Sequence, residues 1–87
     1  MKIKDGFIMR ELADQTVVVA TGEASRSFNG IIRLNSTGRF LWKLLESETT
    51  EIDLVAAIRD AYDVDAETAQ RDVARFVQSL RDEDLLQ

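Results

Sequence analysis

The spacing of hydrophobic residues changes once along the chain, from strand-like in the first third to helical in the remainder. Two short apolar and β-branched runs, residues 7–12 and 16–20, lie close enough together to predict an antiparallel hairpin. Residues 22–27 are small and polar and predict a loop. Strand character resumes over residues 28–34, where Gly30 predicts a bulge or a point of close approach. We expect this third strand at an edge of the sheet.

Each predicted helix begins after a residue whose side-chain oxygen can accept hydrogen bonds from the free amides of a first turn. Asn35 begins a helix over residues 36–46, Thr50 begins a second that ends near residue 62, and Asp65 begins a third. The apolar stripes behind these caps are Phe40, Leu41, Leu44 and Leu45, then Leu54, Val55, Ile58, Ala61 and Tyr62, and finally Ala69, Val73, Phe76, Val77 and Leu80.

These elements predict an α+β fold that is winged-helix-like, with a three-stranded antiparallel sheet followed by three helices. The 87 residues suffice for a single domain over residues 1–87 and leave no room for a second core. The chain has no internal repeat.

Composition and charge narrow the class of protein. With 45% hydrophobic and 31% charged residues, the chain has the composition of a soluble globular protein. Its 11 basic and 16 acidic side chains give a net charge of -5, which repels phosphate backbones, so we expect no nucleic-acid partner. Charges interrupt the N-terminal residues every few positions, so we expect neither a signal peptide nor a membrane-spanning run there. A cytoplasmic protein without a membrane partner is predicted.

The chain contains neither histidine nor cysteine. This absence removes disulfides, thiolate chemistry, imidazole bases and nearly every zinc or transition-metal site. No histidine is present to activate a serine or threonine, and no glycine-rich phosphate loop is found. We therefore expect a protein that is not an enzyme and holds no cofactor or metal.

A series of residues in the second and third parts of the chain resembles one known family. The series is Gly30, Leu34-Asn35, Thr37-Gly38, Leu41-Trp42, Leu44-Leu45, Ala61-Tyr62, Asp72-Val73, Phe76 and Leu80. In order and spacing it is similar to the pyrroloquinoline-quinone biosynthesis protein D (PqqD) family, and the resemblance covers nearly the whole chain.

The resemblance implies a RiPP recognition element, a module that captures the leader segment of a ribosomally made precursor peptide. It also implies the partners: the precursor peptide and a modifying enzyme, often a radical S-adenosylmethionine (SAM) maturase and elsewhere a protease or cyclase. In that family the leader is added as a strand to the third strand, in the groove between this strand and the third helix. An edge strand offers free N–H and C=O groups for such an addition.

Strand and helix geometry then select candidate contacts for the peptide. If Ile32 and Leu34 point into the core, Ile31 and Arg33 face the opposite side or the groove edge. On the third helix one flank of the core stripe is the candidate groove wall. The predicted peptide-binding residues are Asn29, Gly30, Ile31, Ile32, Arg33, Thr68, Asp72, Arg75, Phe76 and Ser79. The other flank, with Gln70, Ala74 and Arg81, is the alternative.

Several of these residues also have an ordinary structural explanation. Trp42 is better explained as a plain core aromatic, and Phe76 fits the core and the groove about equally. Arg33, Arg71, Arg75 and Arg81 are ordinarily explained by a solvated, salt-bridged face, since carboxylates lie among them. Of these four, Arg33 and Arg75 also fit a peptide contact.

Two other classes of function remain open from the sequence. A winged-helix DNA-binding regulator would place Arg71, Arg75 and Arg81 in the major groove, although acidic residues on the same helix oppose this. The other class is a subunit that only stabilises a larger enzyme.

The last residues depart from the family pattern. Asp84 stands where the family tends to have glycine before the closing leucines, so we expect an insecure helix end and a frayed tail.

Overall fold

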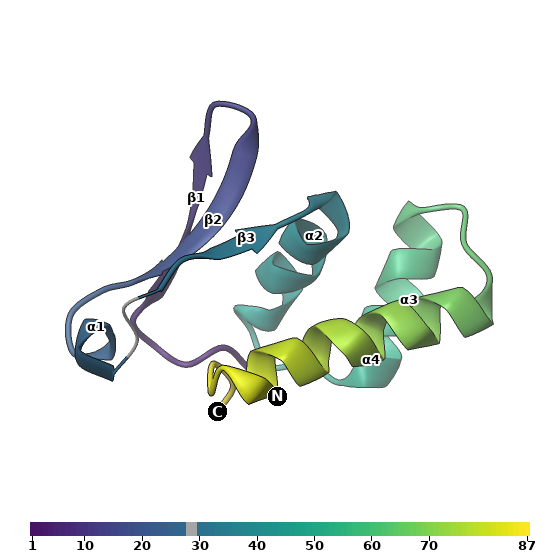
Figure 1. Ribbon diagram of the computed structural model, residues 1–87. Coiled ribbons are helices and arrows are strands. Elements are labelled where there is room, and N and C mark those ends of the chain that lie inside the picture. Colours follow the sequence, from purple (N-terminus) through teal and green to yellow (C-terminus); the bar gives the residue numbers. More distant parts are fainter. Residues whose placement is uncertain (28–29) are drawn as a thin grey trace.

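The predicted change from strands to helices is present in the computed structural model, which describes residues 1–27 and 30–87 (Figure 1). The elements in chain order are β1 (Phe7–Leu12), β2 (Gln15–Ala20), α1 (Ala24–Ser27), β3 (Ile32–Leu34), α2 (Ser36–Leu45), α3 (Glu51–Ala61) and α4 (Ala66–Asp82). The strands form one antiparallel sheet in the order β1-β2-β3. The α+β fold and the edge position of the third strand are confirmed.

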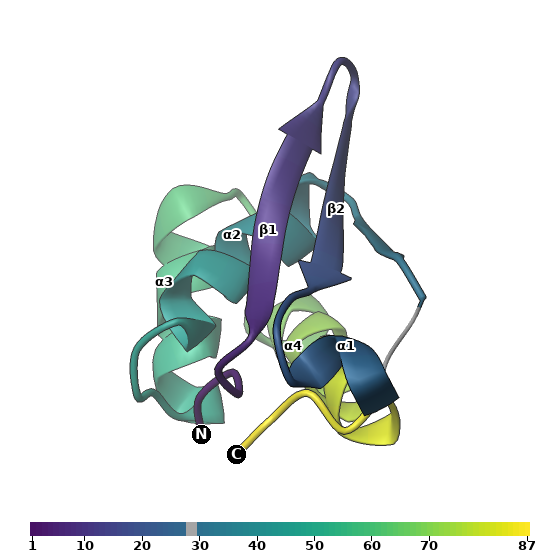
Figure 2. The same ribbon diagram turned by 90° about the vertical axis from the view of Figure 1, so that its left-hand side faces the viewer.

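β1 and β2 form the predicted hairpin, which projects away from the helices (Figures 1 and 2). Leu12 pairs with Gln15, so Ala13 and Asp14 alone make the turn, and β2 begins one residue earlier than predicted. Ala13 has a φ of 44°, because a two-residue turn requires positive φ at its centre.

Two predictions for the segment after β2 were wrong. Residues 24–27 form the short helix α1 instead of a loop, in which Ala24 N donates to Thr21 O at 3.2 Å. A single turn is too short to show helical periodicity in a sequence. The third strand covers Ile32–Leu34, so residues 30 and 31 of the predicted strand lie outside it, and only residues 16–18 of β2 pair with β3. Gly30 precedes the strand, and residues 28 and 29 lie outside the described residues.

The core lies between the inner face of the sheet and helices α2, α3 and α4. Its largest side chain is Trp42, which is fully buried, so the prediction of a core role is confirmed. The other large side chains at its centre are Leu41, Leu45, Leu54, Leu80, Leu85, Val18, Val73 and Val77. None of the helices in the described ranges is both long and apolar enough to cross a membrane.

All three predicted helix caps are confirmed. Asn35 Oδ1 accepts from Gly38 N at 2.7 Å, and Thr50 Oγ1 accepts from Asp53 N at 3.1 Å. Asp65 Oδ1 accepts from Thr68 N at 2.7 Å, and the hydrogen bonds from Thr68 hold the pKa of the Asp65 carboxyl below its usual value. Each side chain satisfies an amide that the first turn of a helix leaves free.

The C-terminal tail is ordered, so the expectation of fraying was wrong. Asp84 adopts a left-handed conformation with φ 59°, and Leu85 N then donates to Leu80 O at 2.9 Å while Asp84 N donates to Arg81 O at 3.0 Å. These two bonds form a Schellman motif at the end of α4. The tail is further held by Leu86, which pairs with Ile3, so both chain ends lie side by side (Figures 1 and 2).

Asp84→Gly is expected to raise the free energy of unfolding by about 0.5–1 kcal/mol, since glycine adopts positive φ without a Cβ penalty. The ion pair from Lys4 Nζ to Asp84 Oδ1, at 2.9 Å, is exposed and contributes little. Urea unfolding followed by circular dichroism measures the change. Lys4→Gln, which removes only the ion pair, is the control. An Asp84→Gly protein less stable than Lys4→Gln would contradict the account.

Candidate functional site

The hydrogen bonds of the hairpin determine which backbone groups of β3 are free. Thr21 N donates to Gly6 O at 2.6 Å, so these two residues form a hydrogen-bonded pair. Hydrogen-bonded and non-hydrogen-bonded pairs alternate along an antiparallel ladder. Counting along the register, residues 15, 17 and 19 of β2 direct their backbone groups toward β1, and residues 16 and 18 direct theirs toward β3.

Arg33 is therefore the residue of β3 whose backbone is free. Ile32 pairs with Val18 and Leu34 pairs with Thr16, so both direct their N–H and C=O groups to β2. Arg33 lies opposite Val17, whose backbone groups point to β1. The N–H and C=O of Arg33 consequently point to the open side of the sheet, where a further strand can pair with them.

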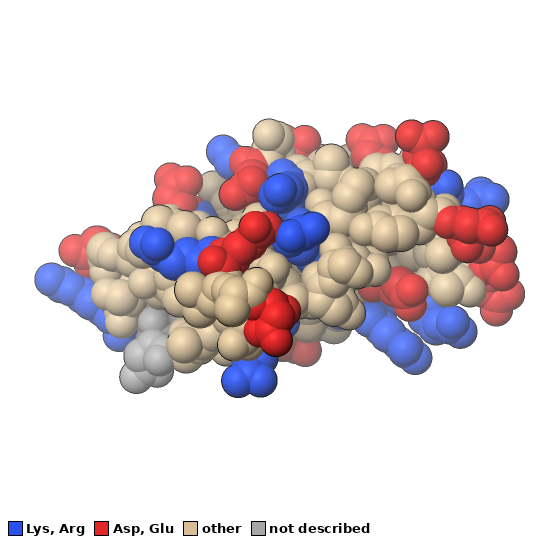
Figure 3. All heavy atoms as spheres, turned by 90° about the horizontal axis from the view of Figure 1, so that it is seen from above, with Lys and Arg blue, Asp and Glu red and all other residues tan. Residues whose placement is uncertain are grey.

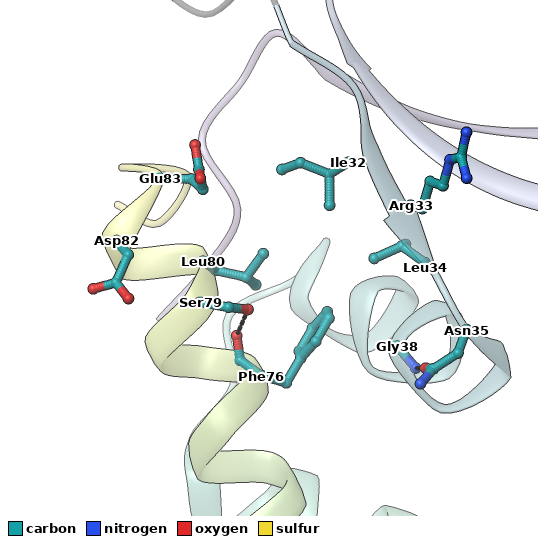
Figure 4. Close-up of a pocket in the computed structure, with 10 residues that line it drawn as sticks. All are labelled: Ile32, Arg33, Leu34, Asn35, Gly38, Phe76, Ser79, Leu80, Asp82 and Glu83. Carbon is teal, nitrogen blue, oxygen red and sulfur yellow. Dashed lines mark hydrogen bonds between the residues drawn. The ribbon is translucent and has the colours of Figure 1, made fainter.

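The side chains of β3 alternate as predicted. Ile32 and Leu34 are half-buried and pack against the core, whereas Arg33 is exposed. Figure 4 shows Ile32 and Leu34 directed toward α4 and Arg33 directed away from it. Ile31, just before the strand, is 67% exposed.

A groove of about 400 Å³ lies between β3, the start of α2 and the second half of α4 (Figure 4). We call it the β3–α4 groove. Its lining residues are Ile32, Arg33, Leu34, Asn35, Gly38, Phe76, Ser79, Leu80, Asp82 and Glu83. A second hollow of about 340 Å³ adjoins it along α4 and shares three of these residues. This hollow is lined by Asn35, Thr37, Gly38, Leu41, Asp72, Arg75 and Phe76.

Phe76 separates the groove from the hollow and lines both. It is half-buried against the core, and its carbonyl oxygen accepts from Ser79 Oγ at 2.7 Å. Across the groove, Gly38 leaves room for the ring: a Cβ at this position would lie 3.2 Å from Phe76 Cε1 and 3.2 Å from Asn35 Oδ1. The missing side chain at Gly38 therefore helps to keep the groove open.

The structure brings most of the predicted contact residues together. Ile32, Arg33, Phe76 and Ser79 line the groove, and Asp72 and Arg75 line the hollow with Phe76. Thr68 lines neither, and its amide is bonded to the Asp65 cap. Gly30 and Ile31 are exposed before β3, and Asn29 lies outside the described residues.

The choice between the two flanks of the third helix is also resolved. The flank with Asp72 and Ser79 faces the groove and the hollow. On the alternative flank, Gln70 instead borders a small hollow beside Ile52 of α3. Sequence reasoning missed two acidic residues at the end of α4, Asp82 and Glu83, and the residues of the α2 start. For the α2 start, the available signal was Gly38. Glycine is less favourable than alanine within a helix, so a glycine in the first turn indicates a role other than helix formation.

Charges around the site are mixed. Asp82 and Glu83 lie at one end of the groove, while Asp72 and Arg75 lie in the hollow at the other. On the face seen from above, basic and acidic side chains are interspersed and form no continuous basic stripe (Figure 3). Within residues 1–27 and 30–87, no cluster of His, Cys, Asp or Glu side chains has the arrangement of a metal site.

The family model described as coenzyme PQQ synthesis protein D (PqqD) matches residues 9–86. The chain belongs to the PqqD family. This membership accounts for the resemblance that the sequence pattern indicated. No curated protein gives a significant match.

Two solved structures share the fold of this PqqD-family chain. TbiB1 in complex with the TbiA(beta) leader peptide has a TM-score of 0.78 and 29% sequence identity, and the match covers 100% of this chain and 95% of that one. Lasso peptide synthetase B1 complexed with the leader peptide has a TM-score of 0.74 and 18% identity, covering 97% of this chain and 93% of that one. At 18% identity the second structure bears on the fold alone.

Gly38→Ala is expected to move the Phe76 ring and the Asn35 side chain, because the added methyl group would lie within 3.2 Å of each. The free energy of unfolding should change by less than about 1 kcal/mol, since the gain in helix propensity offsets the crowding. NMR signals of the Phe76 ring and the Asn35 side-chain amide report the movement. Lys43→Ala, on the exposed side of α2, is the control. Unshifted signals in Gly38→Ala would show that the glycine does not set the groove width.

Proposed function

We propose that this chain is a RiPP recognition element: a non-catalytic module that binds the leader segment of a ribosomally synthesised precursor peptide by strand addition to β3. It then presents the precursor to a modifying enzyme, such as a radical SAM maturase. The observation that carries the proposal is the free backbone edge at Arg33, beside a groove to which Phe76 and Leu80 contribute apolar surface.

The two parts of this site have different tasks. A bound strand forms main-chain hydrogen bonds with the N–H and C=O of Arg33, which supply affinity for any extended segment. Its alternate side chains then project between β3 and α4, where Phe76 and Leu80 offer apolar surface. The side chains that fit this space determine which segment is bound.

The comparisons support a peptide ligand. TbiB1 is 29% identical over the whole of this chain, and its structure holds a leader peptide. PqqD-family membership extends over residues 9–86, which include β3, α4 and the groove between them. The TbiB1 complex and the family match therefore favour a leader peptide as the ligand of this chain.

The absence of an imidazole or thiol from the sequence supports a non-catalytic role. The groove residues include Ser79, but no histidine exists to take its proton. The chemistry of precursor modification therefore belongs to the partner enzyme, and this chain contributes binding and orientation.

Fluorescence anisotropy with the leader of a precursor encoded beside this gene tests the proposal. Saturable binding at micromolar or lower Kd is expected, with no binding to random duplex DNA at the same salt concentration. Ile31→Pro should weaken leader binding at least tenfold while leaving helicity nearly unchanged, because Ile31 directly precedes β3, and proline removes an N–H there that an added strand would use.

Ile31→Ala is the matched control, since it removes the exposed side chain but keeps the N–H. Equal leader affinity in Ile31→Pro and Ile31→Ala would contradict strand addition at this edge. Binding of DNA without binding of the leader would instead favour a regulator. Binding of neither would indicate a subunit that acts only with its enzyme.

A further inference from the structure

Arg33 combines a free backbone with an unpaired charge at the centre of β3. Its guanidinium is exposed on the side of the sheet opposite the groove (Figure 4). Three other basic side chains of the described residues have acidic partners: Arg39 Nη1 lies 2.7 Å from Glu11 Oε1, Lys4 is paired with Asp84, and Arg26 is paired with Glu23. No carboxylate among residues 1–27 and 30–87 forms an ion pair with Arg33.

The neighbouring strand supplies no acidic group to Arg33. Arg33 pairs with Val17 of β2, and Val17 in turn pairs with Arg10 of β1. Two arginines therefore lie on this face of the sheet with an apolar residue between them. Asp14 in the hairpin turn borders a hollow with Arg33 but forms no ion pair with it.

A strand added antiparallel to β3 would place one residue directly opposite Arg33. This residue would exchange hydrogen bonds with the Arg33 backbone, and its side chain would lie on the same face as the guanidinium. The residues before and after it lie opposite Ile32 and Leu34, so their side chains turn to the other face and enter the β3–α4 groove. The side chains of the bound segment thus alternate between the face that carries the Arg33 guanidinium and the β3–α4 groove.

We propose that Arg33 selects an acidic residue in the bound segment, and that apolar residues on both sides of this acid fill the β3–α4 groove. The inference rests on the proposed function and specifies its substrate class: a leader containing an apolar–acidic–apolar triplet in extended conformation. Opposite charges directly across two strands stabilise their pairing, and like charges destabilise it. Arg33 is accordingly a specificity residue, whereas its backbone serves any sequence.

A charge-reversal selection tests this assignment. A phage-displayed library of random twelve-residue peptides is selected against the wild-type protein, Arg33→Glu and Arg10→Glu. Arg10→Glu is the matched control, because it reverses an exposed arginine on the same face but on the opposite edge strand. Circular dichroism checks that each variant is folded, and Arg33→Gln provides a neutral variant if Arg33→Glu does not fold.

The wild type and Arg10→Glu are expected to enrich peptides with Asp or Glu between two apolar residues. Arg33→Glu should enrich Lys or Arg at that position, and Arg33→Gln should show no charge preference. With synthetic peptides from the selection, exchanging the central acid for lysine should weaken wild-type binding about threefold to fivefold and strengthen Arg33→Glu binding. A double-mutant cycle over these four pairs isolates the interaction between the two side chains.

One outcome is that the wild type and Arg33→Glu both enrich peptides that carry the same central residue between two apolar residues. That result would overturn the role of Arg33 and leave strand addition intact. A reversal in Arg10→Glu rather than Arg33→Glu would overturn the placement on β3. No enrichment on any variant would overturn the proposed function together with this inference.

Discussion

The one-sided pairing of β3 is the constraint on which the rest of the account depends. β3 is bonded to β2 along one edge, and the register leaves the N–H and C=O of Arg33 without a partner strand. Free edges invite pairing with other chains, and proteins limit this by keeping edge strands short or charged. β3 has both features, since it covers only Ile32–Leu34 and carries Arg33 at its centre. The edge is therefore open to a strand that brings suitable side chains, and it is a poor template for indiscriminate association.

The second constraint is the position of α4 beneath this edge. Its buried stripe fixes the helix against the core, so the adjoining row of Asp72, Phe76 and Ser79 is turned toward β3 and α2. The cap at Asp65 and the Schellman motif at Asp84 hold the two ends of the helix. The groove is thus formed before any ligand arrives, and binding need not order it, which reduces the entropic cost of association.

The parts of the fold that depend on local chemistry could be predicted from the sequence. Asn35, Thr50 and Asp65 mark the helix starts because a side-chain cap is a short-range interaction. The extent of β3 could not be predicted, because it depends on how many residues pair with β2, which is a tertiary contact. Asp84 shows the same limit: its left-handed conformation is supported by the burial of Leu85 and Leu86, which the sequence does not reveal. For the site, helical geometry offered two flanks of α4, and only tertiary packing distinguishes them.

Amide hydrogen exchange measured by NMR, with and without the leader peptide, tests the central claim most directly. The amide of Arg33 is expected to gain protection on leader addition, whereas the amides of Ile32 and Leu34, already directed to β2, should change little. This alternation is specific to a strand added at β3. Protection gained instead at Met9 and Glu11, whose amides face the open edge of β1 in the same register, would contradict the account.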